Sequence, residues 1–374
     1  MESWVSPPKQ GERRAFFAAS NSERGFISYY ETLFRNQAQL LYIIKGGPGT
    51  GKSRLMWDMV AAGESAGFAA ELYFCSSDPT SLDAVILTHA DGRSVIFLDG
   101  TAPHTMEACA PGVNEQLIDL GAFWSRDALL AHHDRIAALM EEKSARYTTA
   151  YRYLGAAGLC EKNIADAIAP ALDRAALARL ARRLVAGAME KTAAAATLPP
   201  KCVCTNGLGM KGWAHLPTFE TLAKRTCRLE SCHGVEYAVL AALLAEGRAK
   251  GARMTVSCHP VYPAYIDGIY FEDSRVAFLV DAPQDGTDAT EPEAAEQYRR
   301  LVKLRRLIKP ALIRGGRSAL RAAKRQRDAL VSAAEQALLH AATPHFALEE
   351  IYSGAMDFDA KETRSRALAH EVFG

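Results

Sequence analysis

The chain has 374 residues, of which 49% are apolar, and its formal net charge at pH 7 is +1. This length suggests two or three domains with ordinary hydrophobic cores, and a near-zero charge indicates no particular partner. No run approaches the roughly 20 apolar residues that cross a bilayer. Residues 1–17 also lack the apolar core of a signal peptide. We therefore expect a soluble, cytoplasmic protein with no membrane partner.

The first informative motif is GGPGTGKSR at residues 46–54, which follows the apolar run LLYIIK at 40–45. It fits G-x-x-x-x-G-K-[ST] in full. The apolar run predicts a buried parallel strand, and residues 52–67 predict a helix that ends at Gly67. Strand, glycine-rich loop and helix in this order predict the phosphate-binding loop of a P-loop nucleotide-binding domain, with ATP and Mg²⁺ as cofactors.

The residue types in this motif suit phosphate chemistry. Glycines allow backbone N–H groups to curl around a β-phosphate, and the helix N-terminus adds its positive end. Lys52 would reach the β- and γ-phosphate oxygens, and the Ser53 hydroxyl would be a Mg²⁺ ligand. ATP is preferred to GTP only because no NKxD string is present. The predicted nucleotide-binding residues are Gly46, Gly47, Gly49, Thr50, Gly51, Lys52, Ser53 and Arg54.

A second strand is predicted at 69–75, and a third, SVIFLD at 94–99, ends in Asp99 in the form of a Walker B strand. Asp99 would hold the water shell of the Mg²⁺ ion. Asp91-Gly92 is a hairpin signal, so we expect a short antiparallel excursion in the sheet. Ligands of open α/β sheets lie at the carboxyl ends of the strands. This rule gathers four polar residues around the Lys52 loop: Asp78, Asp83, Asp99 and His104.

The group that activates the attacking water is not where many P-loop ATPases have it, because Gly100 stands in place of their glutamate. Asp78 in CSSDPTSLD is the candidate base or water-orienting group. This string resembles the S-T-D-P switch segment of the arsenite-pump and tail-anchored-protein-targeting ATPases, and the resemblance implies that Asp78 orients water. A substrate contact or a turn cap are its alternatives. His104 could sense the γ-phosphate or be a polar turn residue.

The second half repeats blocks of the first in the same order. Residues 61–79 match residues 244–263, and 82–104 match 266–284. These blocks pair Cys75 with Cys258 and Asp83 with Asp267. They indicate a duplicated P-loop unit.

The second copy lacks the groups that bind phosphate. An offset of 183 residues places Val235 at the position of Lys52, and the same offset places Glu236 at the position of Ser53. A valine cannot reach a phosphate, and a glutamate would repel one. Asp281 falls two residues late for a Walker B aspartate. We therefore predict a shortened, degenerate loop that binds no nucleotide.

Each copy is followed by a stretch with helical periodicity. The first predicts a packed face with His133 at its edge: Leu129, His133, Ile136, Met140, Tyr147, Tyr151 and Leu154. The second follows an acidic linker and carries twelve Lys or Arg and no acid over residues 299–327. This segment could contact nucleic acid or another polyanion, supply an arginine to the nucleotide, or pack on acidic surface.

Five cysteines lie in the second half, with His233 and His259 beside two of them. Their CxC and Cx4C spacings suit buried free thiols better than a zinc site. The cysteines are Cys202, Cys204, Cys227, Cys232 and Cys258.

KGGPGTGKS, CSSDP, LDGTAPH, PGVNEQLIDLGAFW and the closing GAMDF together resemble a family of bacterial tandem P-loop ATPases of unestablished role. The resemblance implies an α/β fold: a mostly parallel sheet with helices on both faces, present twice and each time followed by a helical arm. The expected divisions are an active domain at 1–125, a first arm at 126–200, a degenerate domain at 201–290 and a basic arm with a C-terminal segment at 291–374.

The leading hypothesis is an ATPase whose nucleotide cycle moves the arms. A small-molecule kinase, with Asp78 or Asp83 accepting a hydroxyl proton, is the first alternative. A non-hydrolysing nucleotide sensor that binds a partner is the second.

Overall fold

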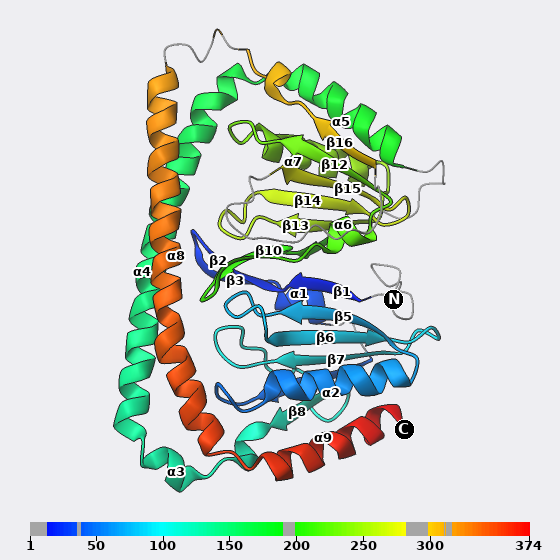
Figure 1. Ribbon diagram of the computed structural model, residues 1–374. Helices are drawn as coiled ribbons and strands as arrows, with labels where there is room; N and C mark the ends of the chain where they lie inside the picture. The colour runs from blue at the N-terminus through cyan, green and yellow to red at the C-terminus, as the bar shows by residue number, and fades with distance from the viewer. Residues whose placement is uncertain (1–12, 36–38, 190–198, 282–297, 310, 312–315) are drawn as a thin grey trace. The chain divides into compact units, whose positions relative to one another are not determined.

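The computed structural model describes residues 13–35, 39–189, 199–281, 298–309, 311 and 316–374. They form two compact units, each built around one six-stranded mixed sheet (Figure 1). We call them the first-sheet unit (7–155, 206–216 and 331–374) and the second-sheet unit (156–205 and 217–330). The helices α4 (His133–Ile168) and α8 (Arg317–Gly354) each contribute residues to both units. The acidic linker lies outside the described residues.

The remaining elements belong to one unit each. The first-sheet unit contains β1 (Arg14–Phe17), β2 (Ala19–Ser22), β3 (Gly25–Ser28), α1 (Tyr30–Phe34), β4 (Leu40–Lys45), α2 (Lys52–Ser65), β5 (Ala69–Phe74), β6 (Leu82–Thr88), β7 (Ser94–Asp99), β8 (Glu115–Asp119), the 3₁₀ turn η1 (Leu120–Phe123), α3 (Arg126–Leu130), β10 (Asn206–Gly209), β11 (Gly212–His215) and α9 (Phe358–Phe373). The second-sheet unit contains η2 (Ala169–Ala171), α5 (Arg174–Ala188), β9 (Lys201–Val203), α6 (Thr218–Leu222), β12 (Arg225–Glu230), α7 (Val235–Ala249), β13 (Met254–Cys258), β14 (Ile266–Phe271), β15 (Val276–Asp281), β16 (Tyr298–Val302) and η3 (Arg305–Leu307).

The two sheets have the same strand order. It is β1-β5-β6-β7-β4-β8 in the first and β9-β13-β14-β15-β12-β16 in the second. The third strand of each order, β6 or β14, is antiparallel to both neighbours, and all other pairings are parallel. The antiparallel excursion predicted at Asp91-Gly92 is confirmed, because this dipeptide joins β6 to β7.

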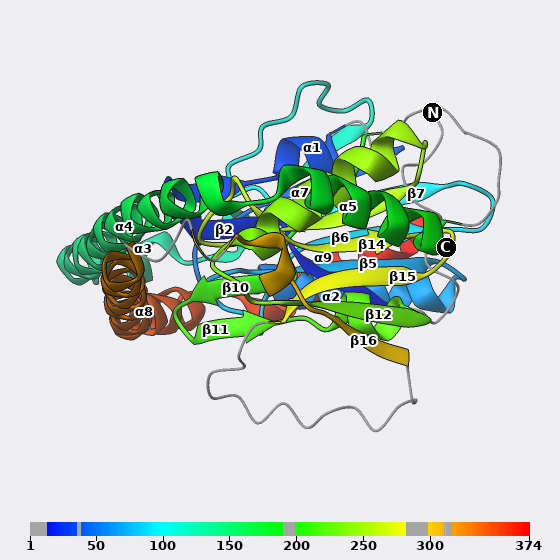
Figure 2. The ribbon, with the colours of Figure 1, turned by 90° about the horizontal axis from the view of Figure 1, so that it is seen from above.

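Apolar residues on the sheet strands explain why helices cover them. The helix α2 lies against β5 and β6, and α9 packs beside it (Figure 1). Leu55, Met59 and Leu368 from these helices are buried in one core with Ile44 and Phe97 of the strands. In the second-sheet unit α5 packs against α7 in the same way (Figure 2). Burial of each large apolar side chain is worth about 1.5–3 kcal/mol.

The helices α5 and α9 each follow one sheet in the sequence but belong to the unit of the other sheet. The N–H of Asp357, just before α9, donates to the carbonyl of Phe123 in η1 (2.7 Å). The N–H of Asp173, just before α5, donates to the carbonyl of Leu307 in η3 (2.8 Å). Both members of the second pair lie 184 residues from their counterparts. The chain therefore exchanges its terminal helices reciprocally between the two units.

The structure corrects the predicted arms. The expected first face fails near its start because α3 and α4 are separate helices, and His133 and Met140 are exposed. The basic segment is not one arm, because residues 298–302 form β16, an edge strand of the second sheet. The segment 331–374 groups with the first sheet. None of the described helices has the length and apolarity needed to cross a membrane.

The attachment of α9 predicts a stability effect. The Asp357 side chain caps this helix by accepting the N–H of Ala360 (2.9 Å). Asp357→Ala should therefore lower the free energy of unfolding by about 1 kcal/mol. Asp359→Ala, which removes an exposed acid from the first turn of α9, should cost less than half of this. Urea unfolding of both variants tests the cap, and equal losses would contradict it.

Candidate functional site

The loop of residues 46–51 joins β4 to α2 and is shaped by its glycines. Gly51 begins the helix with φ of +83°, and Gly49 has φ of +70°, a region that side chains disfavour. A β-carbon at Gly49 would lie 2.5 Å from the carbonyl oxygen of Glu349, and one at Gly47 would lie 2.8 Å from the Tyr352 ring. The glycines therefore allow the end of α8 to pack directly on the loop.

Lys52 is the cation of this loop. Its Nζ donates to the carbonyl oxygens of Gly46 (2.9 Å) and Gly47 (2.7 Å), and it lies 3.5 Å from Oδ2 of Asp99. The next residue, Ser53, accepts the N–H of Leu82 at its hydroxyl oxygen (3.0 Å). The predicted residues Lys52, Ser53 and Asp99 are thus brought to one place.

Asp99 ends β7, whose neighbour in the sheet is β4. Its Oδ1 accepts the N–H of Thr101 (2.8 Å), and the Thr101 hydroxyl donates to the carbonyl of Gly46 (3.1 Å). A β-carbon at Gly100 would lie 2.4 Å from Cγ2 of Ile43. Packing therefore leaves no room for the glutamate that many ATPases have at this position.

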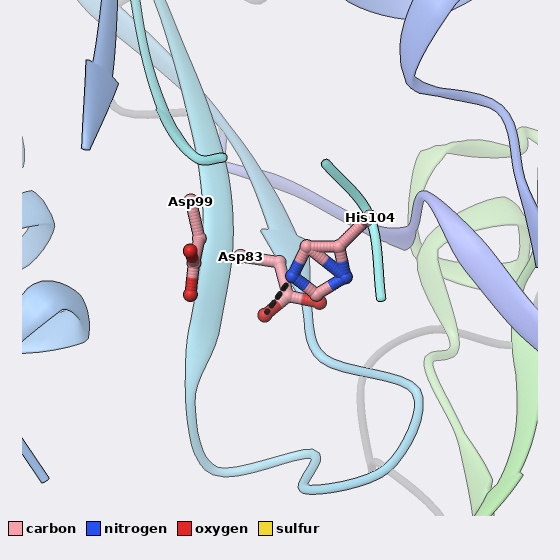
Figure 3. A group of neighbouring side chains, drawn as sticks. All are labelled: Asp83, Asp99 and His104. Carbon is pink, nitrogen blue, oxygen red and sulfur yellow. Dashed lines mark ion pairs between the residues drawn. The ribbon is translucent and has the colours of Figure 1, made fainter. Parts of the chain in front are cut away.

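Asp83 and His104 lie beside Asp99 (Figure 3). Ligand atoms of all three lie within 4.8 Å of one another, and His104 Nε2 is 3.9 Å from Asp83 Oδ1. Burial, and next the Asp99 carboxylate, raise the pKa of Asp83 well above its usual range. Burial lowers the pKa of His104, whose ring stacks on Tyr30 at 4.9 Å. This cluster of a protonatable acid and a neutral imidazole can exchange protons or hold a cation.

Asp78 is occupied by another cation. Oδ1 of Asp78 accepts a bond from Nζ of Lys211 (2.7 Å), and it also accepts the Thr80 hydroxyl. Burial alone would raise the pKa of Asp78, but the bonds from Lys211 and Thr80 outweigh it and the pKa is lowered. Lys211 lies between β10 and β11, about 130 residues further along the chain. The sequence offered no motif that links the two residues.

Two more lysines near the loop were also missed, because they come from helices without a motif. Nζ of Lys143 in α4 lies 2.9 Å from Nδ1 of His345 in α8, and burial lowers the pKa of Lys143. Lys361 in α9 is 4% exposed, and its Cε lies 3.5 Å from the place of a β-carbon on Gly51. Only the packing of α8 and α9 on the loop brings these residues close.

The second loop, between β12 and α7, has four residues against six in the first. Gly234 begins α7 with φ of +84°, as Gly51 begins α2, so Val235 and Glu236 do stand where Lys52 and Ser53 stand. The Glu236 carboxylate is buried and accepts the N–H of Cys232 (2.8 Å). The shortened second loop is thus confirmed, and it encloses its own carboxylate.

The strand pairings refine how the two halves correspond. Cys75 donates its N–H to Ser81, and His259 donates its N–H to Tyr265 (both 2.9 Å). Cys75 therefore corresponds to His259, and the predicted match to Cys258 is wrong by one residue because the loop lengths differ. In the same way Val280 stands at the sheet position of Asp99.

The eight cysteines are all free thiols, as expected. Cys202 accepts a bond from the neighbouring Cys258, which lowers the pKa of Cys202 to about 7. Among the described residues, the group with metal-binding geometry is Asp83, Asp99 and His104, and it contains no cysteine.

No family model matches the sequence, and comparison with curated proteins and with solved structures likewise finds no match.

The raised pKa of Asp83 predicts how stability depends on pH. A carboxyl with a raised pKa in the folded state binds more protons there than in the unfolded state, so its cost grows as pH rises above about 4. Asp83→Asn should therefore melt higher than the native protein at pH 7.5, and the gap should close toward pH 4. Glu362→Gln is the control, because Arg366 lowers the pKa of this exposed carboxyl. A constant gap for Asp83→Asn would contradict the assignment.

Proposed function

We propose that the first-sheet unit binds MgATP as a P-loop NTPase and hydrolyses it. The carrying observation is the convergence of the glycine-rich loop, Lys52 and Asp99 at the carboxyl ends of the adjacent parallel strands β4 and β7. Ligands of open α/β sheets bind at this edge. The resemblance to tandem P-loop ATPases is consistent with this proposal and stays a hypothesis.

Lys52 and the loop amides would bind the phosphates. The lysine now donates to two carbonyls of its own loop, and a β- or γ-phosphate oxygen would be a stronger partner for the ammonium group. Ser53 and Asp99 offer the oxygen ligands that Mg²⁺ prefers and would hold the ion. When bound, Mg²⁺ would neutralise charge on the phosphates.

The attacking water would be oriented by Asp83 and His104 in place of Asp78. Asp78 is tied to Lys211, and its lowered pKa makes it a weak base. The Nδ1 atom of His104 is buried and has no hydrogen-bond partner among the described residues. A buried imidazole nitrogen without a partner is ready to bond a water or a phosphate oxygen.

Lys143 would supply a further positive charge to the nucleotide. Its counterpart 184 residues later is Arg327, whose guanidinium is neutralised by Glu161 at 2.7 Å in the second-sheet unit. Lys143 instead faces the imidazole of His345, which leaves its charge available to an anion. This difference follows the presence of a phosphate-type loop in one unit and its loss in the other.

The second-sheet unit would bind no nucleotide. Its Glu236 carboxylate already occupies the short loop, and Val235 and Val280 replace the lysine and the aspartate. The equal strand orders support descent from a duplicated unit.

Lys52→Ala should abolish ATP turnover and weaken ATP binding at least about tenfold, since a charge-assisted bond contributes roughly 1.5–3 kcal/mol. The native protein should bind one nucleotide per chain in calorimetry. Lys45→Ala is a poor control because this residue also bonds the sheet edge, so Lys162→Ala on the exposed face of α4 serves instead. Unchanged binding and turnover in Lys52→Ala would overturn the proposal.

Radiolabelled ATP separates the reaction classes. Release of free phosphate by the native protein alone supports hydrolysis, and transfer of label to a component of a metabolite extract indicates a kinase. Tight binding without either product indicates a sensor.

Lys143→Ala should lower ATP turnover by at least about tenfold, whereas Lys143→Arg should retain most of it because the charge is kept. Arg146→Ala, which alters an exposed residue of the same helix, should leave turnover within about twofold. If Lys143→Ala turns over ATP normally with an unchanged melting temperature, Lys143 does not act on the nucleotide.

A further inference from the structure

A cavity of about 480 Å³ lies in the second-sheet unit, where α5 covers the edge of the sheet formed by β12, β15 and β16. This volume is within the range of small-molecule sites. The lining residues are Arg183, Leu184, Gly187, Arg225, Cys227, Phe278 and Arg300.

Three arginines from separate elements converge on this cavity. Arg183 comes from α5, Arg225 from the start of β12 and Arg300 from β16, and the lining residues include no acid. The guanidinium of Arg225 donates one bond, to the carbonyl of Gly187. Its Nε is buried and has no hydrogen-bond partner within the described part of the chain. Three like charges in one cavity repel one another unless an anion joins them.

The floor of the cavity is apolar. Leu184 and Phe278 are buried, and Cys227 lies beside them on the sheet. A ligand would therefore meet positive charge at the rim and an apolar surface beneath it.

The first-sheet unit provides an internal comparison. Cys227 pairs with Phe278 across β12 and β15, and the same positions of β4 and β7 are Tyr42 and Phe97. The Tyr42 and Phe97 rings stack at 4.7 Å and belong to the core. The replacement of a tyrosine by a cysteine thus accounts for open space in the second-sheet unit.

The arginines are also specific to the second-sheet unit. Arg225 stands at the strand position of Leu40, and Arg300 stands at that of Gln116. Arg183 lies ten residues beyond the helix cap Asp173, where α9 has an alanine at 367. One unit therefore has a filled core where the other has a cavity and three positive charges.

We propose that this cavity binds a small organic anion. A phosphate or carboxylate group is held by Arg183, Arg225 and Arg300, because guanidinium groups bond such oxygens in pairs. The apolar part of the ligand lies against Leu184 and Phe278. The site is separate from the proposed nucleotide loop and does not depend on its activity.

The test uses the full-length Lys52→Ala protein, so that the nucleotide loop contributes little anion binding. Inorganic pyrophosphate and citrate are titrated separately by calorimetry at up to millimolar concentration. Arg183→Gln and Arg300→Gln, which alter exposed side chains, should each raise the dissociation constant about tenfold or more. Arg182→Gln, an exposed neighbour on α5 that does not line the cavity, is the matched control and should change it less than about twofold.

Cys227→Tyr refills the space as Tyr42 does in the first-sheet unit and should abolish binding, with folding checked by circular dichroism. Binding of pyrophosphate alone indicates a phosphate ligand, binding of citrate alone a carboxylate ligand, and either supports the proposal. If neither anion binds, or if Arg183→Gln and Arg300→Gln bind as tightly as Arg182→Gln, the proposal is wrong.

Discussion

The candidate site depends on how one buried ammonium group is neutralised. Lys52 lies between the carbonyls of its own loop and the Asp99 carboxylate, and Asp83 lies beside Asp99 in a buried cluster. A buried charge is costly unless it is paired and hydrogen-bonded. One lysine cannot fully compensate two carboxylates, and the raised pKa of Asp83 reflects this imbalance. The site is therefore suited to receive a further cation, with a phosphate group to occupy the lysine.

The exchange of terminal helices sets what surrounds each loop. In the first-sheet unit, α8 and α9 bring Tyr352 and Lys361 against the loop glycines. In the second-sheet unit, α4 brings Glu161 within 3.5 Å of the place of a β-carbon on Gly234. Each loop is thus packed by a helix that follows the other sheet in the sequence. A change at one loop would act on a segment that continues directly into the other unit, which is how a nucleotide cycle could be transmitted along the chain.

The second-sheet unit illustrates how a phosphate-type loop can be lost without loss of the fold. A helix N-terminus leaves unpaired N–H groups and a positive end, which an anion normally satisfies. Glu236 supplies that anion from within the chain by accepting the N–H of Cys232. The unit keeps its sheet and helix packing, and the same sheet acquired open space at Cys227 with three arginines around it. We infer that one copy kept the nucleotide chemistry and the other became free to diverge.

The sequence by itself determined the local features. The strand, loop and helix around Lys52 follow from an apolar run, glycines and a helical period, and these patterns act over a few residues. The antiparallel excursion followed from Asp91-Gly92, and the shortened second loop followed from the repeat. All of these depend on neighbours along the chain.

The tertiary structure alone decided which distant groups meet. Lys211 reaches Asp78 and Lys143 reaches His345 across 133 and 202 residues, and neither contact has a local signal. The exchange of α5 and α9 could not be read from periodicity, because a helix pattern shows which face is apolar but not which sheet it covers. Residues 298–302 were taken as part of a basic arm because charge hides a strand at a sheet edge. Long-range packing, rather than local propensity, therefore decided the electrostatics of the site.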